Sequence, residues 1–229
     1  MTAKRFDRLQ AVLRQRQPDL TVIMENVHKP HNLSAIVRTC DAVGIFQAHA
    51  VSTDGGVRQA VNAAKGSQRW VGLRSHRRLE DTLDMARDNG MQVLAAHLAD
   101  DAVDFRDVDY TRPTALLMGS ELDGVSPAAR DAADQRIVVP MHGLVASLNV
   151  SVATALILFE AERQRRLAGM YEHSRLDPDV YRRTLFEWTQ PRIAAWCRRK
   201  GLDYPALDAD GDVIGLPASE TPDKIRRSP

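Results

Sequence analysis

Three short segments of the chain combine polar side chains with a pattern that could do chemistry. In the first, Asn32 and Arg38 stand six residues apart in an otherwise apolar stretch, so the guanidinium has to project from the edge of a buried layer. In the second, an apolar run enters a loop with two glycines and the carboxylate of Glu121. In the third, Ser147 and Asn149 crowd the start of a helical pattern. An arginine can stabilise developing negative charge on oxygen, and hydroxyl, amide and carboxylate groups can orient a reacting hydroxyl.

Each segment taken alone also fits an ordinary structural role. Asn32 can cap a helix, and Arg38 can be a surface arginine whose stem covers apolar groups. Glu121 lies in what is equally a plain turn between a strand and a helix, and Ser147 and Asn149 can both be caps. Only the order and spacing of the three segments together can separate these alternatives.

Several common kinds of site are excluded. The chain has no G-x-G-x-x-G turn, no P-loop and no G-x-S-x-G elbow. His28 and His31 are spaced as in a chelating pair, but no further spaced ligands accompany them, so we expect a plain loop and no metal. Two cysteines cannot form a disulfide scaffold, and the longest apolar stretch, 148–159, is shorter than the roughly 20 residues that span a bilayer. We expect a soluble, cytoplasmic protein that does not enter membranes.

The elements that must position these groups alternate along the middle of the chain. Helices are expected from Asn32 through Val43, over Leu79–Asn89, and through Ala133 from a start at Ser126. Strands separated by helices of this length are typical of a parallel α/β sheet, which binds ligands at the carboxyl ends of its strands. The predicted strands are Thr21–Val27, Ala48–Ser52, Trp70–Leu73, Met91–His97, Thr114–Met118 and Arg136–Val139.

Charge is divided along the chain, although the net charge is only +1. Residues 1–20 carry a net charge of +3, residues 21–159 of −3, residues 160–200 of +4 and residues 201–229 of −3. An acidic body with two basic arms favours a polyanionic partner.

The flanks suggest three parts. A basic N-terminal helix over residues 1–20 carries an apolar stripe of Phe6, Leu9 and Leu13. The α/β domain covers 21–165, and a long helix runs from Asn149 to Leu167 across its end. A basic helical extension covers 166–229; we expect it to be interrupted near Pro191 and loosely ordered past Gly201.

Together, the three segments resemble the signature motifs of the SpoU-type methyltransferases of the SPOUT superfamily. They read N-x5-R from Asn32, L-L-x-G-x-E-x-x-G from Leu116 and P-M-x-G-x3-S-L-N-V-S from Pro140, and the third motif is highly specific. Ser120 departs from the pattern, because relatives often have an amide residue there. The resemblance covers 21–165 and implies a Rossmann-like, mostly parallel α/β domain. It also implies a deep trefoil knot in the C-terminal part of that domain, which nothing in the spacing itself indicates.

The resemblance implies an RNA 2′-O-methyltransferase that uses S-adenosylmethionine. Asn32 would hold Arg38 or the ribose, Glu121 would order its loop, and Ser147 with Asn149 would orient the hydroxyl. A guanidinium stays protonated in proteins, so we expect Arg38 to bind phosphate and stabilise the alkoxide while that phosphate shares in proton removal. Motif matching places the cofactor mainly against the backbone of Ala96, Gly119, Val139, Met141 and Leu148.

Enzymes of this family are homodimers whose site is completed across the interface. The helix Asn149–Leu167 is apolar at Val152, Ala155, Leu156 and Phe159, a face that supplies either part of that interface or packing on its own sheet. The expected RNA partner is tRNA, and the arginines that we expect to contact its phosphates are Arg5, Arg8, Arg14, Arg163, Arg165, Arg166, Arg175, Arg182 and Arg183.

The two flanks resemble those of the branch that methylates guanosine 18 in the tRNA D-loop, which is therefore the expected reaction. One alternative is a ribose methyltransferase for ribosomal RNA or the tRNA wobble position. Such relatives often carry a separate N-terminal RNA-binding domain or lack a long C-terminal extension. A second alternative, a non-catalytic RNA-binding module, conflicts with the intact Asn32, Arg38, Glu121, Ser147 and Asn149.

Overall fold

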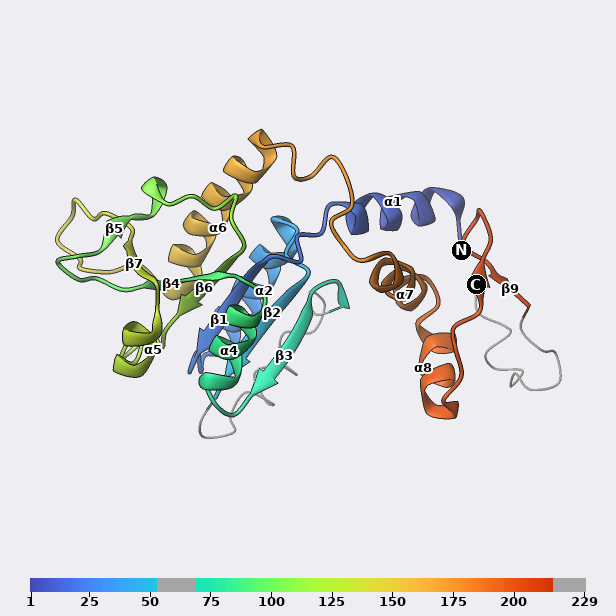
Figure 1. Cartoon of the computed structure of the whole chain (residues 1–229), viewed down its shortest axis with the longest axis horizontal. Coiled ribbons are helices and arrows are strands. Elements are labelled where there is room, and N and C mark those ends of the chain that lie inside the picture. Colours follow the sequence, from blue (N-terminus) through green and yellow to red (C-terminus); the bar gives the residue numbers. More distant parts are fainter. Residues whose placement is uncertain (53–68, 216–229) are drawn as a thin grey trace. The chain divides into compact units, whose positions relative to one another are not determined.

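The computed structural model describes residues 1–52 and 69–215. The chain forms two compact units (Figure 1): residues 17–171, and residues 1–16 together with the chain from Glu172 onward. The two ends of the sequence, expected as separate flanks, thus contribute to one unit. None of the described helices is long and apolar enough to cross a membrane.

A seven-stranded sheet forms the centre of the larger unit, with every neighbouring pair of strands parallel. The strand order is β3-β2-β1-β6-β4-β7-β5. All six predicted strands are present, which confirms the α/β class with a mostly parallel sheet. The strands are β1 Leu20–Glu25, β2 Gln47–Val51, β3 Gly72–His76, β4 Gln92–Ala96, β5 Val103–Asp104, β6 Thr114–Met118 and β7 Gln135–Val138.

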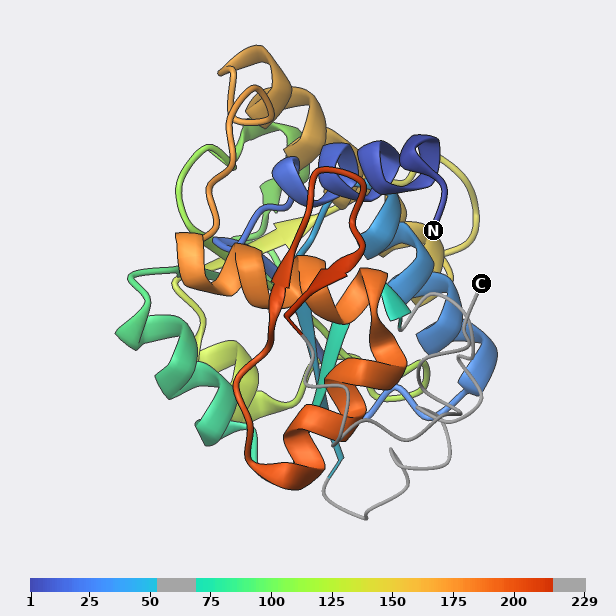
Figure 2. The ribbon, with the colours of Figure 1, turned by 90° about the vertical axis from the view of Figure 1, so that its right-hand side faces the viewer.

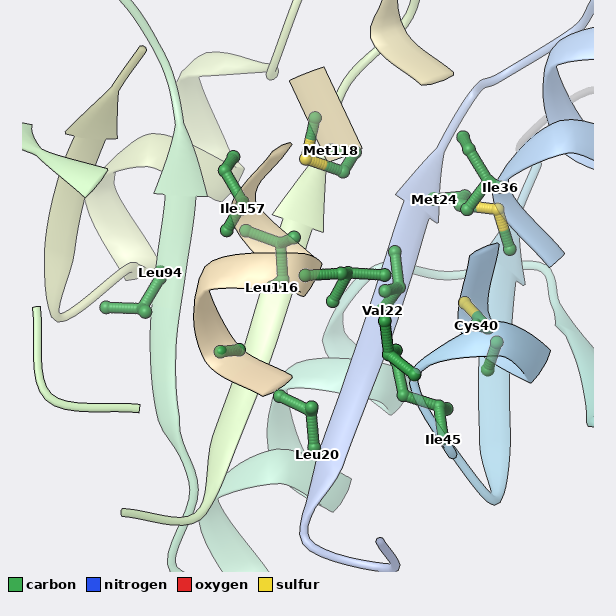
Figure 3. Packing of buried hydrophobic residues seen from close by; sticks show 14 of the residues in the cluster. Leu20, Val22, Met24, Ile36, Cys40, Ile45, Leu94, Leu116, Met118 and Ile157 are labelled. Atoms are coloured by element: carbon green, nitrogen blue, oxygen red, sulfur yellow. The ribbon is translucent and has the colours of Figure 1, made fainter. Parts of the chain in front are cut away.

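Helices cover both faces of this sheet because alternate strand residues point to opposite sides. On one face α2 (Pro30–Ala42) and α6 (Val150–Leu167) pack against each other and over a core that includes Leu20, Val22 and Leu116 (Figure 3). On the other face, α4 (Glu80–Asp88) and α5 (Pro127–Ala132) cover residues one position out of phase, such as Ile23 and Leu117. Burial on both faces explains why β1 and β6 are mainly apolar and do not alternate apolar with polar residues.

The helix caps agree with the sequence at two ends and differ at one. Ser126 Oγ accepts a hydrogen bond from Ala129 N at 3.2 Å, and Asn149 Oδ1 accepts one from Ser151 N at 2.9 Å. Asn32, however, does not cap α2. Lys29 is the residue before the helix and Pro30 takes the first position, a place that suits proline because its missing N–H would have no partner there. Asn32 lies inside the helix with only 2% of its surface exposed.

In its described residues, the smaller unit has three helices and a hairpin (Figure 2). The predicted stripe of α1 (Ala3–Arg14) is buried, and α1 packs on α7 (Pro178–Thr189). Pro191 begins α8 (Pro191–Lys200), so the expected interruption is present. The chain past Gly201 is more ordered than expected: β8 (Ala206–Leu207) pairs with β9 (Val213–Ile214). The final part of the tail, 216–229, lies outside the described residues.

Candidate active site

A cavity of about 490 Å³ opens where β4, β6 and β7 end. This is the edge at which parallel sheets bind ligands, because the loops after neighbouring strands meet there. Its walls come from the residues after β4, the loop after β6, the segment 137–150 and the first turns of α6. The residues assigned to the cofactor all line this one cavity: Ala96, Gly119, Val139, Met141 and Leu148.

The loop after β6 folds back on itself directly beneath the cavity. Ser120 N donates to Gly124 O at 3.0 Å, and Gly124 N donates to Ser120 O at 3.1 Å. A Cβ on Gly119 would lie 2.0 Å from the carbonyl carbon of Gly124, so only glycine fits. Gly124 itself has a φ of 65°, in the left-handed region. Ser120, the departure from the family pattern, closes the turn by accepting a hydrogen bond from Asp123 N at 2.9 Å.

Three of the predicted catalytic side chains meet at one point beside this loop. Asn32 Nδ2, from α2, donates to Glu121 Oε1, and Asn149 Nδ2, at the start of α6, donates to Asn32 Oδ1 at 3.2 Å. Asn149 Oδ1 is held in turn by Ser151 N and Ser151 Oγ, at 2.9 and 2.6 Å. We call Glu121, Asn32 and Asn149 the amide cluster. Because every link in it has a defined donor and acceptor, its orientation is set before any substrate arrives.

The other two predicted catalytic residues stand outside this cluster. Ser147 lines the cavity with an exposed side chain. Arg38 is exposed on α2, about 9 Å farther along the helix axis than Asn32, and it is not among the described residues that line the cavity. Within one copy of the chain, the structure therefore brings Asn32, Glu121 and Asn149 together and leaves Arg38 apart.

Two titratable residues that line the cavity were not predicted from the sequence. Lys29 precedes α2, and His97 follows β4 with Arg130 Nη1 at 3.1 Å from its Nε2. Burial, then the charges of Arg130 and Arg136, lowers the pKa of His97 below its usual value, while Asp101 opposes this. Neither residue belongs to a motif, and the sequence around a single lysine or histidine does not indicate whether it lines a cavity.

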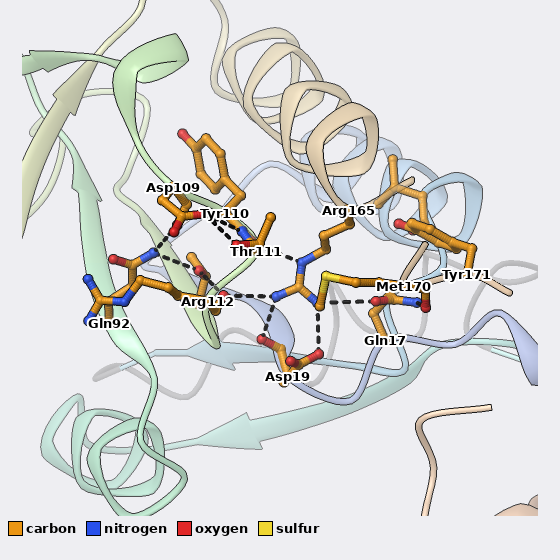
Figure 4. Close-up of polar contacts among 12 residues, drawn as sticks. Gln17, Asp19, Gln92, Asp109, Tyr110, Thr111, Arg112, Arg165, Met170 and Tyr171 are labelled. Carbon is orange, nitrogen blue, oxygen red and sulfur yellow. Dashed lines mark hydrogen bonds and ion pairs between the residues drawn. The ribbon is translucent and has the colours of Figure 1, made fainter. Parts of the chain in front are cut away.

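Arg165 corrects the list of expected RNA contacts. Its side chain is completely buried inside the larger unit (Figure 4), so it cannot reach a phosphate. Nε donates to Tyr110 O at 2.8 Å, Nη1 to Asp19 Oδ1 at 2.7 Å and Gln17 Oε1 at 3.2 Å, and Nη2 to Asp19 O and Arg112 O at 3.1 and 3.0 Å. All five donors of the guanidinium are thereby used.

The remaining predicted RNA contacts are exposed. Some are held by carboxylates of their own helices: Arg163 by Glu160 at 2.7 Å, Arg166 by Glu162 at 3.1 Å, and Arg182 by Asp179. Exposed ion pairs of this kind are weak, so they leave these arginines able to exchange partners. The exposed set is Arg5, Arg8, Arg14, Arg163, Arg166, Arg175, Arg182 and Arg183.

Known proteins are similar to this chain over most of its length. The tRNA (guanosine(18)-2′-O)-methyltransferase of Escherichia coli K12 is 51% identical over 215 residues, which cover 93% of this chain and 94% of that protein. The Thermus thermophilus enzyme of the same name is 55% identical over 82% of this chain and 96% of its own length.

Solved structures agree with these relatives. The Aquifex aeolicus TrmH/SpoU tRNA modifying enzyme superposes with a TM-score of 0.75 at 44% identity, covering 81% of this chain and 94% of that chain. An AdoMet-bound rRNA methyltransferase from Sinorhizobium meliloti superposes with a TM-score of 0.57 at 35% identity, over 68% of this chain and 59% of that one.

Two family models match almost the whole described chain. The SpoU rRNA Methylase family matches residues 19–159, and the SpoU rRNA methylase C-terminal family matches residues 163–215. The trefoil knot stays a prediction of the family resemblance. The parallel sheet, the cavity at its carboxyl edge and these matches together show that the chain belongs to the SpoU rRNA Methylase family.

Proposed function

We propose that the protein transfers a methyl group from S-adenosylmethionine to the ribose 2′-hydroxyl of guanosine 18 in tRNA. The observation that carries this proposal is the meeting of the amide cluster with the five cofactor positions at one cavity. The choice of nucleotide follows the names of the Escherichia coli and Thermus thermophilus relatives, which match over 93% and 82% of this chain.

The cavity fits S-adenosylmethionine in size and in chemistry. Its volume lies within the roughly 300–1,000 Å³ of small-molecule sites, and Ala96, Met141 and Leu148 offer apolar contact to an adenosine. Gly119 lines the cavity and lets the backbone of Gly124 approach closely, which keeps the loop after β6 tight at this wall. When bound, the cofactor supplies a methyl group on a sulfonium, which is an activated leaving group. The protein therefore has mainly to align the attacking oxygen, a contribution that can reach about 7–11 kcal/mol.

The amide cluster supplies that alignment. The carboxylate of Glu121 fixes the amide of Asn32, which fixes Asn149, so the ribose hydroxyl would meet groups that do not reorganise during the reaction. Ser147 lines the cavity, and it would contact the same hydroxyl. Arg38 stabilises the developing alkoxide and binds the neighbouring phosphate, to which the hydroxyl proton passes.

Arg38 belongs to this site if a second copy of the chain completes it, and the surface favours such a homodimer. Val152, Leu156 and Phe159 of α6 are 43–52% exposed, whereas Ile157 and Leu158 are turned into the core. The predicted apolar face therefore does not pack on its own sheet. Exposed apolar side chains continue around the cavity mouth and on the adjoining loop, at Leu98, Leu122, Leu144 and Val145. Several large exposed apolar side chains on one helix and beside a cavity are typical of an interface between subunits.

tRNA binding is assigned to the basic surfaces of both units. Arg5, Arg8 and Arg14 lie on α1 and Arg182 and Arg183 on α7, so the smaller unit presents a positive surface suited to phosphates. Both cysteines of the described chain are buried and neither is in a disulfide, which suits a cytoplasmic enzyme.

The decisive experiment maps the modified nucleotide. A tRNA transcript is incubated with protein and S-adenosylmethionine, and ribose methylation is located by mass spectrometry; a matched transcript with 2′-deoxyguanosine at position 18 is the control. We expect one methyl group at guanosine 18 and none in the control. Arg38→Ala should lower single-turnover methylation at least about a hundredfold while binding S-adenosylhomocysteine normally, because Arg38 does not line the cavity. Methylation confined to ribosomal RNA or to the wobble nucleotide would contradict the proposal, as would a protein that binds tRNA without methylating it.

A further inference from the structure

The charged lining of the cavity is a feature that the sequence motifs do not explain. Of the described residues around it, Lys29 alone has a permanent positive charge, and Glu121 is the only carboxylate. Lys29 comes from the segment before α2 and Glu121 from the loop after β6. Two separate elements thus bring one charge of each sign to an otherwise mainly apolar space.

His97, the remaining titratable group, adds no positive charge to this lining. A guanidinium can only donate hydrogen bonds, so the contact of Arg130 Nη1 with His97 Nε2 requires that nitrogen to be unprotonated. Burial and the nearby Arg130 and Arg136 also lower the pKa of His97. The imidazole is therefore neutral at neutral pH, and an anion that enters the cavity finds its cationic partner in Lys29.

The cofactor that fits this cavity has a matching charge pattern. S-adenosylmethionine and its product S-adenosylhomocysteine end in an α-amino acid, with one carboxylate and one ammonium group. Transfer of a carboxylate out of water is unfavourable unless a cation or several donors replace the water. We propose that Lys29 binds the α-carboxylate of the cofactor and thereby selects ligands that carry the amino-acid end, while Glu121 provides the complementary charge for the α-ammonium group.

An RNA phosphate is the competing anion for an exposed lysine. Arg38, which we assign to phosphate, is not among the described residues that line the cavity, whereas Lys29 is. That placement favours the cofactor as the partner of Lys29. The inference rests on the proposed methyl transfer, because it takes the cavity to be the cofactor site.

Two ligands that differ only at the amino-acid end test the role of Lys29. Calorimetry would compare S-adenosylhomocysteine with 5′-methylthioadenosine, which keeps the adenosine and the thioether but lacks both charges. We expect Lys29→Met to weaken S-adenosylhomocysteine binding about tenfold and methylthioadenosine binding less than about twofold. Lys29→Arg should stay close to wild type, and Lys29→Gln serves as a second neutral replacement. Arg87→Met, which removes one exposed charge from α4, is the matched control for net charge.

Three results would overturn the inference. They are unchanged S-adenosylhomocysteine affinity in both neutral variants, an equal loss for both ligands, or a loss of tRNA affinity alone. The last would assign Lys29 to an RNA phosphate. A wild-type protein that binds S-adenosylhomocysteine but methylates no RNA would refute the proposed function and leave the role of Lys29 standing. A wild type that methylates tRNA alongside a Lys29→Met variant with normal cofactor affinity would refute only the role of Lys29.

Discussion

Replacing Arg165 by methionine should destabilise the larger unit far more than any change of a neighbouring arginine. The methionine fills much of the same space but removes the charge and all five donors. Asp19 then keeps a carboxylate without its main partner, and the carbonyl oxygens of Tyr110 and Arg112 each lose a donor. Buried acceptors left in this way cost free energy because the folded chain shields them from water.

The size of the effect follows from how well water can reach Asp19. Removing one partner of a fully buried ion pair costs about 3–5 kcal/mol. Arg165 is fully buried but the side chain of Asp19 is 17% exposed, so water can solvate part of the carboxylate. We therefore expect the lower end of that range, about 3 kcal/mol. For a unit of this size, that corresponds to a melting temperature lower by roughly 6–12 °C.

Urea denaturation followed by circular dichroism measures this difference. Arg166→Met is the matched control, because Arg166 is the next residue on the same helix, is 59% exposed and forms a surface ion pair with Glu162; the change should cost less than about 1 kcal/mol. Asp19→Asn combined with Arg165→Met should recover part of the loss, because the uncompensated charge is then gone. If Arg165→Met and Arg166→Met unfolded at the same urea concentration, the assignment of Arg165 to the folded interior would be refuted.

Three further changes test other parts of the structure. Gly119→Ala should abolish S-adenosylhomocysteine binding, whereas Gly143→Ala, with nothing within 4 Å of the added carbon, should not; normal binding by both would disprove the tight turn. Burial, then His76 and Arg74, lowers the pKa of His49 to about 4, so its contribution to stability is present above pH 6.5 and is lost as the pH falls towards 4. His49→Gln should therefore lose less stability than wild type between pH 7 and pH 4 in urea titrations, and parallel losses would exclude this cause. Neutralising Arg5, Arg8 and Arg14 together should weaken tRNA binding. It should also lower the slope of log K against log salt concentration by up to about 0.9 per lost phosphate contact. An unchanged slope would show that tRNA binds to another surface.

Short-range patterns were sufficient to predict most elements of the larger unit. β6 was predicted to the residue because a strand buried on both faces is a compact apolar run between breakers. The start of α6 was predicted equally well, because Asn149 is a typical N-cap residue. The less accurate prediction was β3, which begins two residues later than expected; its mostly exposed side chains form no apolar run that could mark it. β5 was not predicted because a strand of two residues is too short to show an alternating pattern of apolar and polar residues.

The sequence also singled out the residues of the candidate site, whose catalytic roles stay predictions, but not their arrangement. Motif spacing singled out Asn32, Glu121 and Asn149, which are 89 and 117 residues apart where they bond. Their hydrogen bonds exist because strand order and helix packing bring α2, the loop after β6 and the start of α6 together at one edge of the sheet. Lys29 and His97 became part of the site only through that folding, since nothing local distinguishes them.

Arg165 shows most directly which features the local sequence pattern can predict and which depend on the tertiary structure. In the sequence it is one of three arginines at 163, 165 and 166, and the basic charge of this region together with the family resemblance assigned all three to RNA. Its position four residues after Ala161 and seven after Leu158 already places it on the buried stripe of α6, a period that the sequence contains. The acceptors that make its burial tolerable are Gln17, Asp19 and the carbonyls of Tyr110 and Arg112, all far away along the chain. A charge can be buried only where such partners converge, and that convergence is a property of the tertiary structure alone.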